Sequence, residues 1–146
     1  MKLLGIDFGT KRIGLALTDP EARLAFPLKT IARSTREKDF AALLDLIREN
    51  EIEAVVIGLP DCDPEPDGSD PLIVRQIRNF AASLGRRTDL PIHFADESFS
   101  SYQAEADLRA QGVGGERLKE VLDQQAAVRI LNTFMSACLK RDDINA

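Results

Sequence analysis

Three short apolar segments occupy the first part of the chain. Residues 2–8, 12–18 and 25–32 are rich in apolar side chains, and short polar or glycine-containing links separate them. Links of this length leave no room for a helical crossover, so the three segments are predicted to form an antiparallel meander of strands.

Helical periodicity begins after this meander. Residues 36–50 place four apolar side chains on one helical face, and Ser34 or Thr35 can cap this helix. The four side chains are Phe40, Leu43, Leu44 and Ile47. A second helix is predicted to have Pro71 in its first turn and residues 68–70 at its cap. Its buried stripe consists of Ile73, Ile77, Phe80 and Leu84.

Two further apolar runs, 54–58 and 90–95, are predicted to be strands. The first shows no alternation, as expected of a central strand covered on both faces. Residues 98–111 and 116–140 are predicted helices, and the second could break near Asp123. The order βββαβαβαα predicts an α/β fold in one domain, residues 1–146. We expect a five-stranded mixed sheet, with three antiparallel strands followed by parallel ones and helices on both faces.

The composition is that of an ordinary globular protein, with 44% apolar and 29% charged residues. No apolar run approaches the ~20 residues of a membrane span, and no signal-peptide pattern precedes the first strand, so we expect a cytoplasmic protein with no membrane partner. The formal net charge of −5 argues mildly against nucleic-acid binding. Basic residues nevertheless gather at 11–12, 29–38 and 75–87, which leaves a local basic stripe open.

The residue types that bind zinc are scarce. Cys62 and Cys138 lie far apart, and the single histidine, His93, has no partner at a metal-ligand spacing, so no zinc site is expected. The acidic, proline-rich loop 59–70 lacks the glycine and glutamate that an EF-hand loop requires, so calcium is not expected there either.

Asp7 interrupts the apolar run of the first strand. A carboxylate between Ile6 and Phe8 loses hydration if the strand is buried, and an unpaired buried charge is costly. A metal ion or a basic side chain is therefore expected beside it. The alternative is that Asp7 only begins the polar turn. Gly9 and Gly14 would let backbone or a ligand approach closely.

Two other places in the chain carry candidate acids. Asp96 and Glu97 follow a buried strand, where ligands tend to bind in open α/β sheets, although acids there also cap helices. Asp123 begins an apolar line of helical spacing that continues to Phe134, so it is predicted to point toward the sheet. The competing interpretation is that Asp123 caps a helix over 124–139.

One acid on each of three separated elements suggests a shared site formed by Asp7, Glu97 and Asp123. Converging carboxylates raise one another's pKa unless a cation compensates. Mg²⁺ or Mn²⁺ would suit because both accept oxygen ligands. Two such ions ~4 Å apart would activate water and stabilise the leaving oxygen, while Lys11 and Arg12 could pair with neighbouring phosphates.

The segment 5–16, GIDFGTKRIGLA, resembles the amino-terminal signature of the bacterial YqgF-like family. Three further segments match in order, namely 56–60, 96–98 followed by Ala104 and Glu105, and 122–131. The family has an RNase H-like fold, and its members are described as Holliday-junction resolvases and as nucleases that mature precursor 16S rRNA. The resemblance implies that Asp7, Glu97 and Asp123 are metal-binding catalytic acids.

The chain departs from the family pattern after the Asp-Glu pair. The family usually has an arginine there and two threonines shortly after, whereas this chain has Ser98, Ser100 and Ser101. The hydroxyls of Ser100 and Ser101 are kept in kind, so with Lys11 and Arg12 they are the expected nucleic-acid contacts. The missing guanidinium puts a phosphate contact at position 98 in doubt.

Three functions are compatible with these residues. The first is a two-metal endonuclease that processes precursor 16S rRNA in ribosome biogenesis, or resolves a Holliday junction in DNA recombination. The second is a nucleotide-binding protein, because Asp-x-Gly-Thr before a basic residue also resembles the phosphate turn of actin-like and sugar-kinase ATPases. The lack of a second glycine-rich loop weighs against it. The third is a non-catalytic RNA-binding ribosome-assembly factor. The sequence leaves open whether the protein is a monomer or a homodimer.

Overall fold

The computed structural model describes residues 1–60, 63–97 and 115–145, and the side chains at 97, 116 and 139–145 lie outside what it describes. Its strands form one five-stranded sheet in the order β3-β2-β1-β4-β5. The strands are β1 (Leu3–Phe8), β2 (Arg12–Thr18), β3 (Ala25–Ala32), β4 (Ala54–Pro60) and β5 (Ile92–Glu97). The mixed α/β sheet predicted from the chain's apolar segments is thereby confirmed.

The pairing of the strands follows the predicted change from antiparallel to parallel. β1 pairs antiparallel with β2, and β2 pairs antiparallel with β3, so the first three strands are the expected meander. β4 pairs parallel with β1 on one side and with β5 on the other. The carboxyl ends of β1, β4 and β5 therefore lie at the same edge of the sheet.

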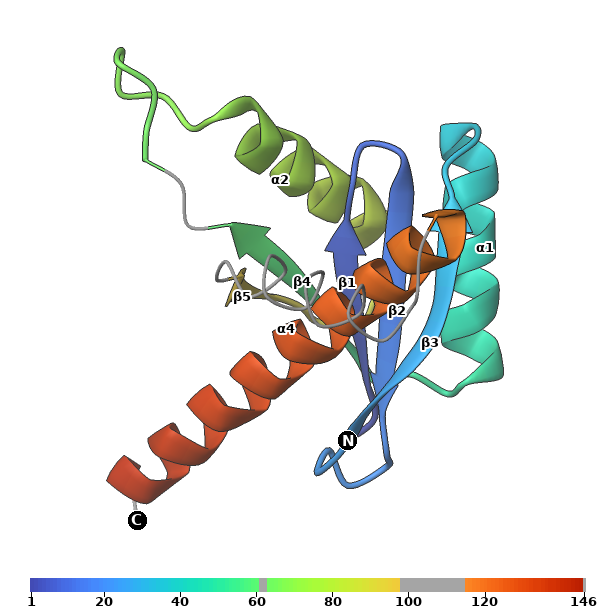
Figure 1. Cartoon of the computed structure of the whole chain (residues 1–146). Helices are drawn as coiled ribbons and strands as arrows, with labels where there is room; N and C mark the ends of the chain where they lie inside the picture. The colour runs from blue at the N-terminus through green and yellow to red at the C-terminus, as the bar shows by residue number, and fades with distance from the viewer. Residues whose placement is uncertain (61–62, 98–114, 146) are drawn as a thin grey trace.

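Helices cover both faces of the sheet. Figure 1 shows α4 (Gly115–Asn145) crossing one face diagonally, with α1 (Arg36–Glu49) and α2 (Leu72–Gly85) on the other side. Alternate strand residues pack in the two resulting layers. Leu4, Ile6 and Ile57 belong to the core under α1 and α2, whereas Leu3 and Val56 belong to the core under α4.

The two helices of the first layer bury the faces that the sequence predicted. In α1, Thr35 is the N-cap residue and its side chain accepts a hydrogen bond from the Lys38 N–H. In α2, the predicted side-chain cap at residues 68–70 is wrong, because Pro71 itself is the N-cap residue and no side chain bonds to the helix end. The Ser69 hydroxyl donates instead to Asp67 within the preceding turn.

Helix α4 is continuous from Gly115 to Asn145. The predicted break near Asp123, and with it the interpretation of Asp123 as an N-cap, is therefore wrong. Glycines on the strands explain why the helix can lie so close. A Cβ on Gly5 would stand 2.8 Å from the Ala127 carbonyl oxygen, and a Cβ on Gly14 would overlap the Asp123 carbonyl group. Packing against the sheet holds this segment helical despite the capping preference of aspartate.

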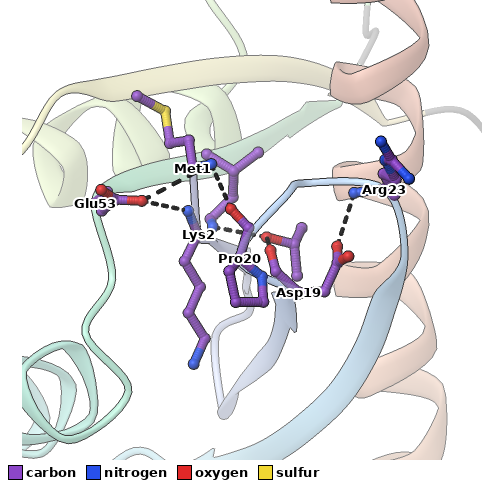
Figure 2. Close-up of polar contacts among 8 residues, drawn as sticks. Met1, Lys2, Asp19, Pro20, Arg23 and Glu53 are labelled. Carbon is purple, nitrogen blue, oxygen red and sulfur yellow. Dashed lines mark hydrogen bonds and ion pairs between the residues drawn. The ribbon is translucent and has the colours of Figure 1, made fainter.

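The amino-terminal end of β1 is held by hydrogen bonds to neighbouring segments (Figure 2). The Met1 amino group donates to the Pro20 carbonyl oxygen at 2.5 Å, and the Lys2 N–H donates to a Glu53 carboxylate oxygen at 2.7 Å. One residue further, the Leu3 N–H donates to the buried Thr18 hydroxyl at 2.8 Å. The start of the central strand is thus fixed to the β2–β3 turn and to the residues before β4.

Several predictions fall on residues outside the described ranges. These are the helix over 98–111, and Asp61 and Cys62 of the acidic loop. No helix within the described ranges combines the length and the apolar character that a membrane-spanning helix requires.

Candidate active site

Asp7 lies near the carboxyl end of the central strand β1. Its neighbours Ile6 and Phe8 pack into the core under α1 and α2. Because successive strand side chains point to opposite faces, Asp7 faces the side covered by α4. It is half-buried, and its Cα is paired with Gly14 on β2. The alternative in which Asp7 merely begins the turn is wrong, since β1 continues through Phe8.

Asp123 comes to this same place from α4. A Cβ on Gly14 would lie 2.8 Å from the Asp123 Cβ, so the helix rests directly on the residue that pairs with Asp7. Paired residues of antiparallel strands have Cα atoms about 4.5–5.5 Å apart. Gly14 therefore brings Asp7 and Asp123 together, and its close approach to backbone, expected from the sequence, is confirmed. The inward orientation predicted for Asp123 is confirmed as well, because its side chain is mostly buried.

A basic side chain lies at this pair of acids. The Arg12 Nε donates a 2.7 Å hydrogen bond to Asp123 Oδ2, and the exposed fractions of the two side chains are 26% and 20%. A basic group was one of the two partners expected beside Asp7, and the structure places it on Asp123. Such a partly buried, charge-assisted bond fixes the direction of the Asp123 carboxylate.

Two polar contacts hold α4 in register over the meander. The Thr30 hydroxyl on β3 donates to the Glu120 carbonyl oxygen at 2.9 Å, and the Gln124 side-chain amide donates to the Thr30 hydroxyl at 3.2 Å. Glu120 and Gln124 flank Asp123 in the helix. The two contacts therefore set the position of Asp123 over β2. Thr30 was not predicted to matter, and only the folded chain reveals its role because its partners lie about ninety residues away in sequence.

The turn between β1 and β2 carries the predicted phosphate-binding residues. Lys11 is exposed there, and Gly9 allows the turn to close through a 2.9 Å hydrogen bond from its N–H to the Arg12 carbonyl oxygen. Arg33 reaches over from the end of β3, and its Nη1 donates to the Gly9 and Thr10 carbonyl oxygens at 3.1 Å. Arg33 was noted only as one member of a basic group, and nothing in the sequence pointed to its role in holding the turn.

Glu97 is the last residue of β5 and pairs with Pro60 at the end of β4. It stands at the same edge of the sheet as Asp7, because β1, β4 and β5 are parallel. Its side chain lies outside what the structure describes, as do Ser98, Ser100 and Ser101 entirely. Asp96, its neighbour, is exposed.

The donor set fits a hard divalent cation. Among the described side chains there is no group of three or more His, Cys, Asp or Glu residues that could hold a metal ion. Asp7 and Asp123 nevertheless both lie at Gly14, and their carboxylate oxygens are the ligands that Mg²⁺ and Mn²⁺ prefer. Arg12 engages only one of the two Asp123 oxygens.

Relatives of known name cover almost the whole chain. A protein of Nitratidesulfovibrio vulgaris (strain Miyazaki F) named "Putative pre-16S rRNA nuclease" is 51% identical over 136 residues, which are 93% of this chain and 94% of that protein. A protein of the same name from Maridesulfovibrio salexigens is 50% identical over 93% of this chain and 98% of its own length.

Solved structures show the same fold. The RuvC protein of Thermus thermophilus, in a complex with a Holliday junction substrate, superposes with a TM-score of 0.57 at 17% identity, covering 95% of this chain and 96% of its own. The fowlpox virus resolvase in complex with junction DNA gives a TM-score of 0.57 at 14% identity, over 95% and 99% of the two chains. The RNase H-like fold implied by the motifs is thereby confirmed. Residues 1–137 match the family described as "RuvX: Holliday junction resolvase", and the chain belongs to this YqgF-like family.

Proposed function

We propose that this protein is a metal-dependent endonuclease that hydrolyses phosphodiester bonds in structured nucleic acid. Precursor 16S rRNA is the leading candidate substrate. Relatives that are half identical over nearly the full chain carry the name of a pre-16S rRNA nuclease. The observation that carries the proposal is the approach of Asp123 on α4 to Asp7 on β1 across Gly14. Two carboxylates at one place repel each other unless a cation compensates, and a bound metal ion supplies that compensation.

Asp7, Asp123 and Glu97 are the carboxylates that we assign to metal binding. Asp7 and Asp123 come from two elements that meet at Gly14. For Glu97 the support is positional. Ala95, two residues earlier on β5, is buried in the core under α4, and strand periodicity assigns position 97 to the same face. A divalent ion held there supplies Lewis-acid and water-activating chemistry, and we assign the enzyme to the two-metal type.

The other residues of the site position the nucleic acid. We assign Lys11 and Arg12 to phosphate contacts beside the cleaved bond, because both lie at the β1–β2 turn next to Asp7. Arg33 keeps this turn in place through the Gly9 and Thr10 carbonyl oxygens. From the family resemblance we also assign Ser100 and Ser101, which lie outside the described residues, to nucleic-acid contacts. The ribosomal precursor would then be bound through a local basic surface on a chain whose net charge is −5.

A Holliday junction is the second candidate substrate. The family model bears that description, and the RuvC and fowlpox structures with the same fold were solved with junction DNA. Resolution of a junction by paired cuts would require two copies of the chain, whereas cleavage of rRNA would not.

The decisive experiment compares both substrates with matched variants. Purified protein is incubated with precursor 16S rRNA and with a four-way DNA junction, with Mg²⁺, with Mn²⁺ and with a chelator. Asp7→Asn is the test variant, and Asp89→Asn, an exposed carboxylate before β5, is the control. We expect cleavage by the wild type and by Asp89→Asn with either ion, and none by Asp7→Asn. Equal cleavage by all three proteins would rule out the proposed site.

A further inference from the structure

A cavity lies on the face of the sheet opposite α4. It has a volume of about 220 Å³ and opens between the end of β1, the first turns of α1 and the middle of α2. Its lining includes Phe8, Arg33, Arg36, Gln76 and Asn79. Of the candidate catalytic acids whose side chains the structure describes, neither Asp7 nor Asp123 lines it. This cavity is therefore separate from the candidate active site.

Aromatic rings and guanidinium groups form a continuous stack beside the cavity. Phe8 stacks on Phe80 with 4.5 Å between ring centroids, and Phe80 stacks on Phe40 at 5.4 Å. Arg33 covers Phe8 at 4.7 Å, and Arg87 covers Phe40 at 4.2 Å. Arg33 ends the stack and also lines the cavity. Unpaired bases stack on guanidinium planes of this kind as well as on aromatic side chains.

Polar groups at the cavity are unevenly used. Arg36 donates to the Ser83 hydroxyl, and the buried Asp39 carboxylate accepts from the Ser34 N–H and lies 3.9 Å from Arg33. By contrast, no hydrogen bond to another described residue engages the side-chain amides of Gln76 and Asn79. Both amides therefore have hydrogen-bond donors and acceptors available for the edge of a nucleobase, and the neighbouring guanidinium plane suits the face of the base.

The size of the cavity selects one ring system. A cavity of about 150 Å³ suffices for benzene, whereas whole drug-sized ligands occupy about 300–1,000 Å³. At about 220 Å³ the cavity has room for one planar base, with its sugar and phosphate outside near the arginines. We propose that it binds a single unpaired nucleotide of the nucleic-acid substrate, with the base against Arg33 and its edge at Gln76 and Asn79.

The cavity is placed to act together with the active site. Phe8 follows Asp7 directly on β1 and points to the opposite face. Arg33 lines the cavity and also holds the β1–β2 turn that carries Lys11 and Arg12. A nucleic-acid strand that passes over this turn would present one phosphate to Asp7 and a nearby base to the cavity. This inference rests on the proposed nuclease function and adds selectivity for an unpaired base near the cut.

The test measures base binding apart from cleavage. The full chain carrying Asp7→Asn is titrated into a short single-stranded RNA containing one 2-aminopurine, whose fluorescence changes when it stacks. The chain has no tryptophan and one tyrosine, so protein fluorescence interferes little. We expect a saturable fluorescence change with the single strand and none when the same base is paired in a duplex. Gln76→Ala with Asn79→Ala should weaken the single-strand affinity about fivefold or more.

A matched control separates the cavity from general effects. Asn132→Ala removes an exposed helical amide on α4 and should leave the affinity unchanged. The inference is wrong if the cavity variant binds like this control, or if duplex and single strand give equal changes. It is also wrong if only free adenosine monophosphate, and not the RNA, depends on Gln76 and Asn79. The nuclease proposal is tested separately by cleavage with Asp7 present, so either can fail without the other.

Discussion

The two ends of strand β1 use polar groups in different ways. At the amino-terminal end, the Glu53 carboxylate accepts from the Lys2 N–H just before β1 (Figure 2). The Thr18 hydroxyl accepts from the N–H of Leu3, the first residue of β1. At the carboxyl end, the interaction is between side chains. Arg12 forms an ion pair with Asp123 above Gly14, the residue that pairs with Asp7 in the sheet. Side chains bonded to the backbone hold the strand in place, whereas the partners of an ion pair between side chains can exchange for a charged ligand. Under the proposed function, the first end therefore serves stability and the second serves chemistry.

Asp7→Asn is expected to have the largest effect, and that effect falls mainly on activity. Loss of one metal-binding carboxylate removes several kcal/mol of transition-state stabilisation, which corresponds to about a 10³-fold slower cleavage. Asparagine has nearly the same size and shape as aspartate, so the free energy of unfolding without metal should change far less than the rate of cleavage does. Single-turnover cleavage and urea unfolding measure the two quantities. A clear loss of stability with normal cleavage would reverse the roles of the two ends.

Gly14→Ala should lower both the stability of the fold and the rate of cleavage. The new Cβ would overlap the Asp123 carbonyl group, so α4 must move away from β2. We expect a loss of about 1–3 kcal/mol in the free energy of unfolding and a large loss of cleavage. Gly85→Ala is the matched control, because a Cβ there meets only Ile92 at 3.6 Å. If both glycine variants unfold at the same urea concentration, the close packing of α4 on Gly14 does not hold in solution.

Local patterns predicted most of the sheet and part of the site. The apolar segments and their short links correctly predicted the meander. The apolar line from Asp123 to Phe134 correctly predicted that Asp123 points toward the sheet. The predicted break at Asp123 failed because capping preference is a local property, whereas the helix is held by Thr30 on a distant strand. The Arg12–Asp123 pair joins residues 111 apart in sequence. Only the crossing of α4 over the sheet determines that pair.

Thr18→Val should affect the amino-terminal end alone. The buried hydroxyl accepts from the Leu3 N–H at 2.8 Å and donates to the Asp19 carbonyl oxygen at 2.9 Å. Valine has a similar shape but leaves the Leu3 N–H unpaired, whereas the Asp19 carbonyl oxygen still accepts from the Ala22 N–H at 3.0 Å. We therefore expect a loss of about 1–3 kcal/mol in the free energy of unfolding. Thr18→Ser keeps the hydroxyl and should recover most of this loss. Thermal unfolding provides the measurement, and cleavage below the melting temperature should equal that of the wild type. Slower cleavage by Thr18→Val at a temperature where the variant is fully folded would show that the two ends of β1 are coupled.

Asp19 should give the smallest effect, visible only in the pH dependence of stability. Its carboxylate accepts hydrogen bonds from the Leu24 and Arg23 N–H groups, and these bonds lower the pKa of Asp19 below its ordinary value of 3.8. Because the pKa is lower in the folded than in the unfolded chain, the stabilisation is complete above the unfolded value. It is lost as the pH falls through the folded value. We expect the stability difference between the wild type and Asp19→Asn to be constant at neutral pH and to shrink below about pH 4. Urea unfolding at a series of pH values measures it. A difference that persists unchanged into acid would mean that the hydrogen bonds of the turn, and not the charge of Asp19, hold this end of the sheet.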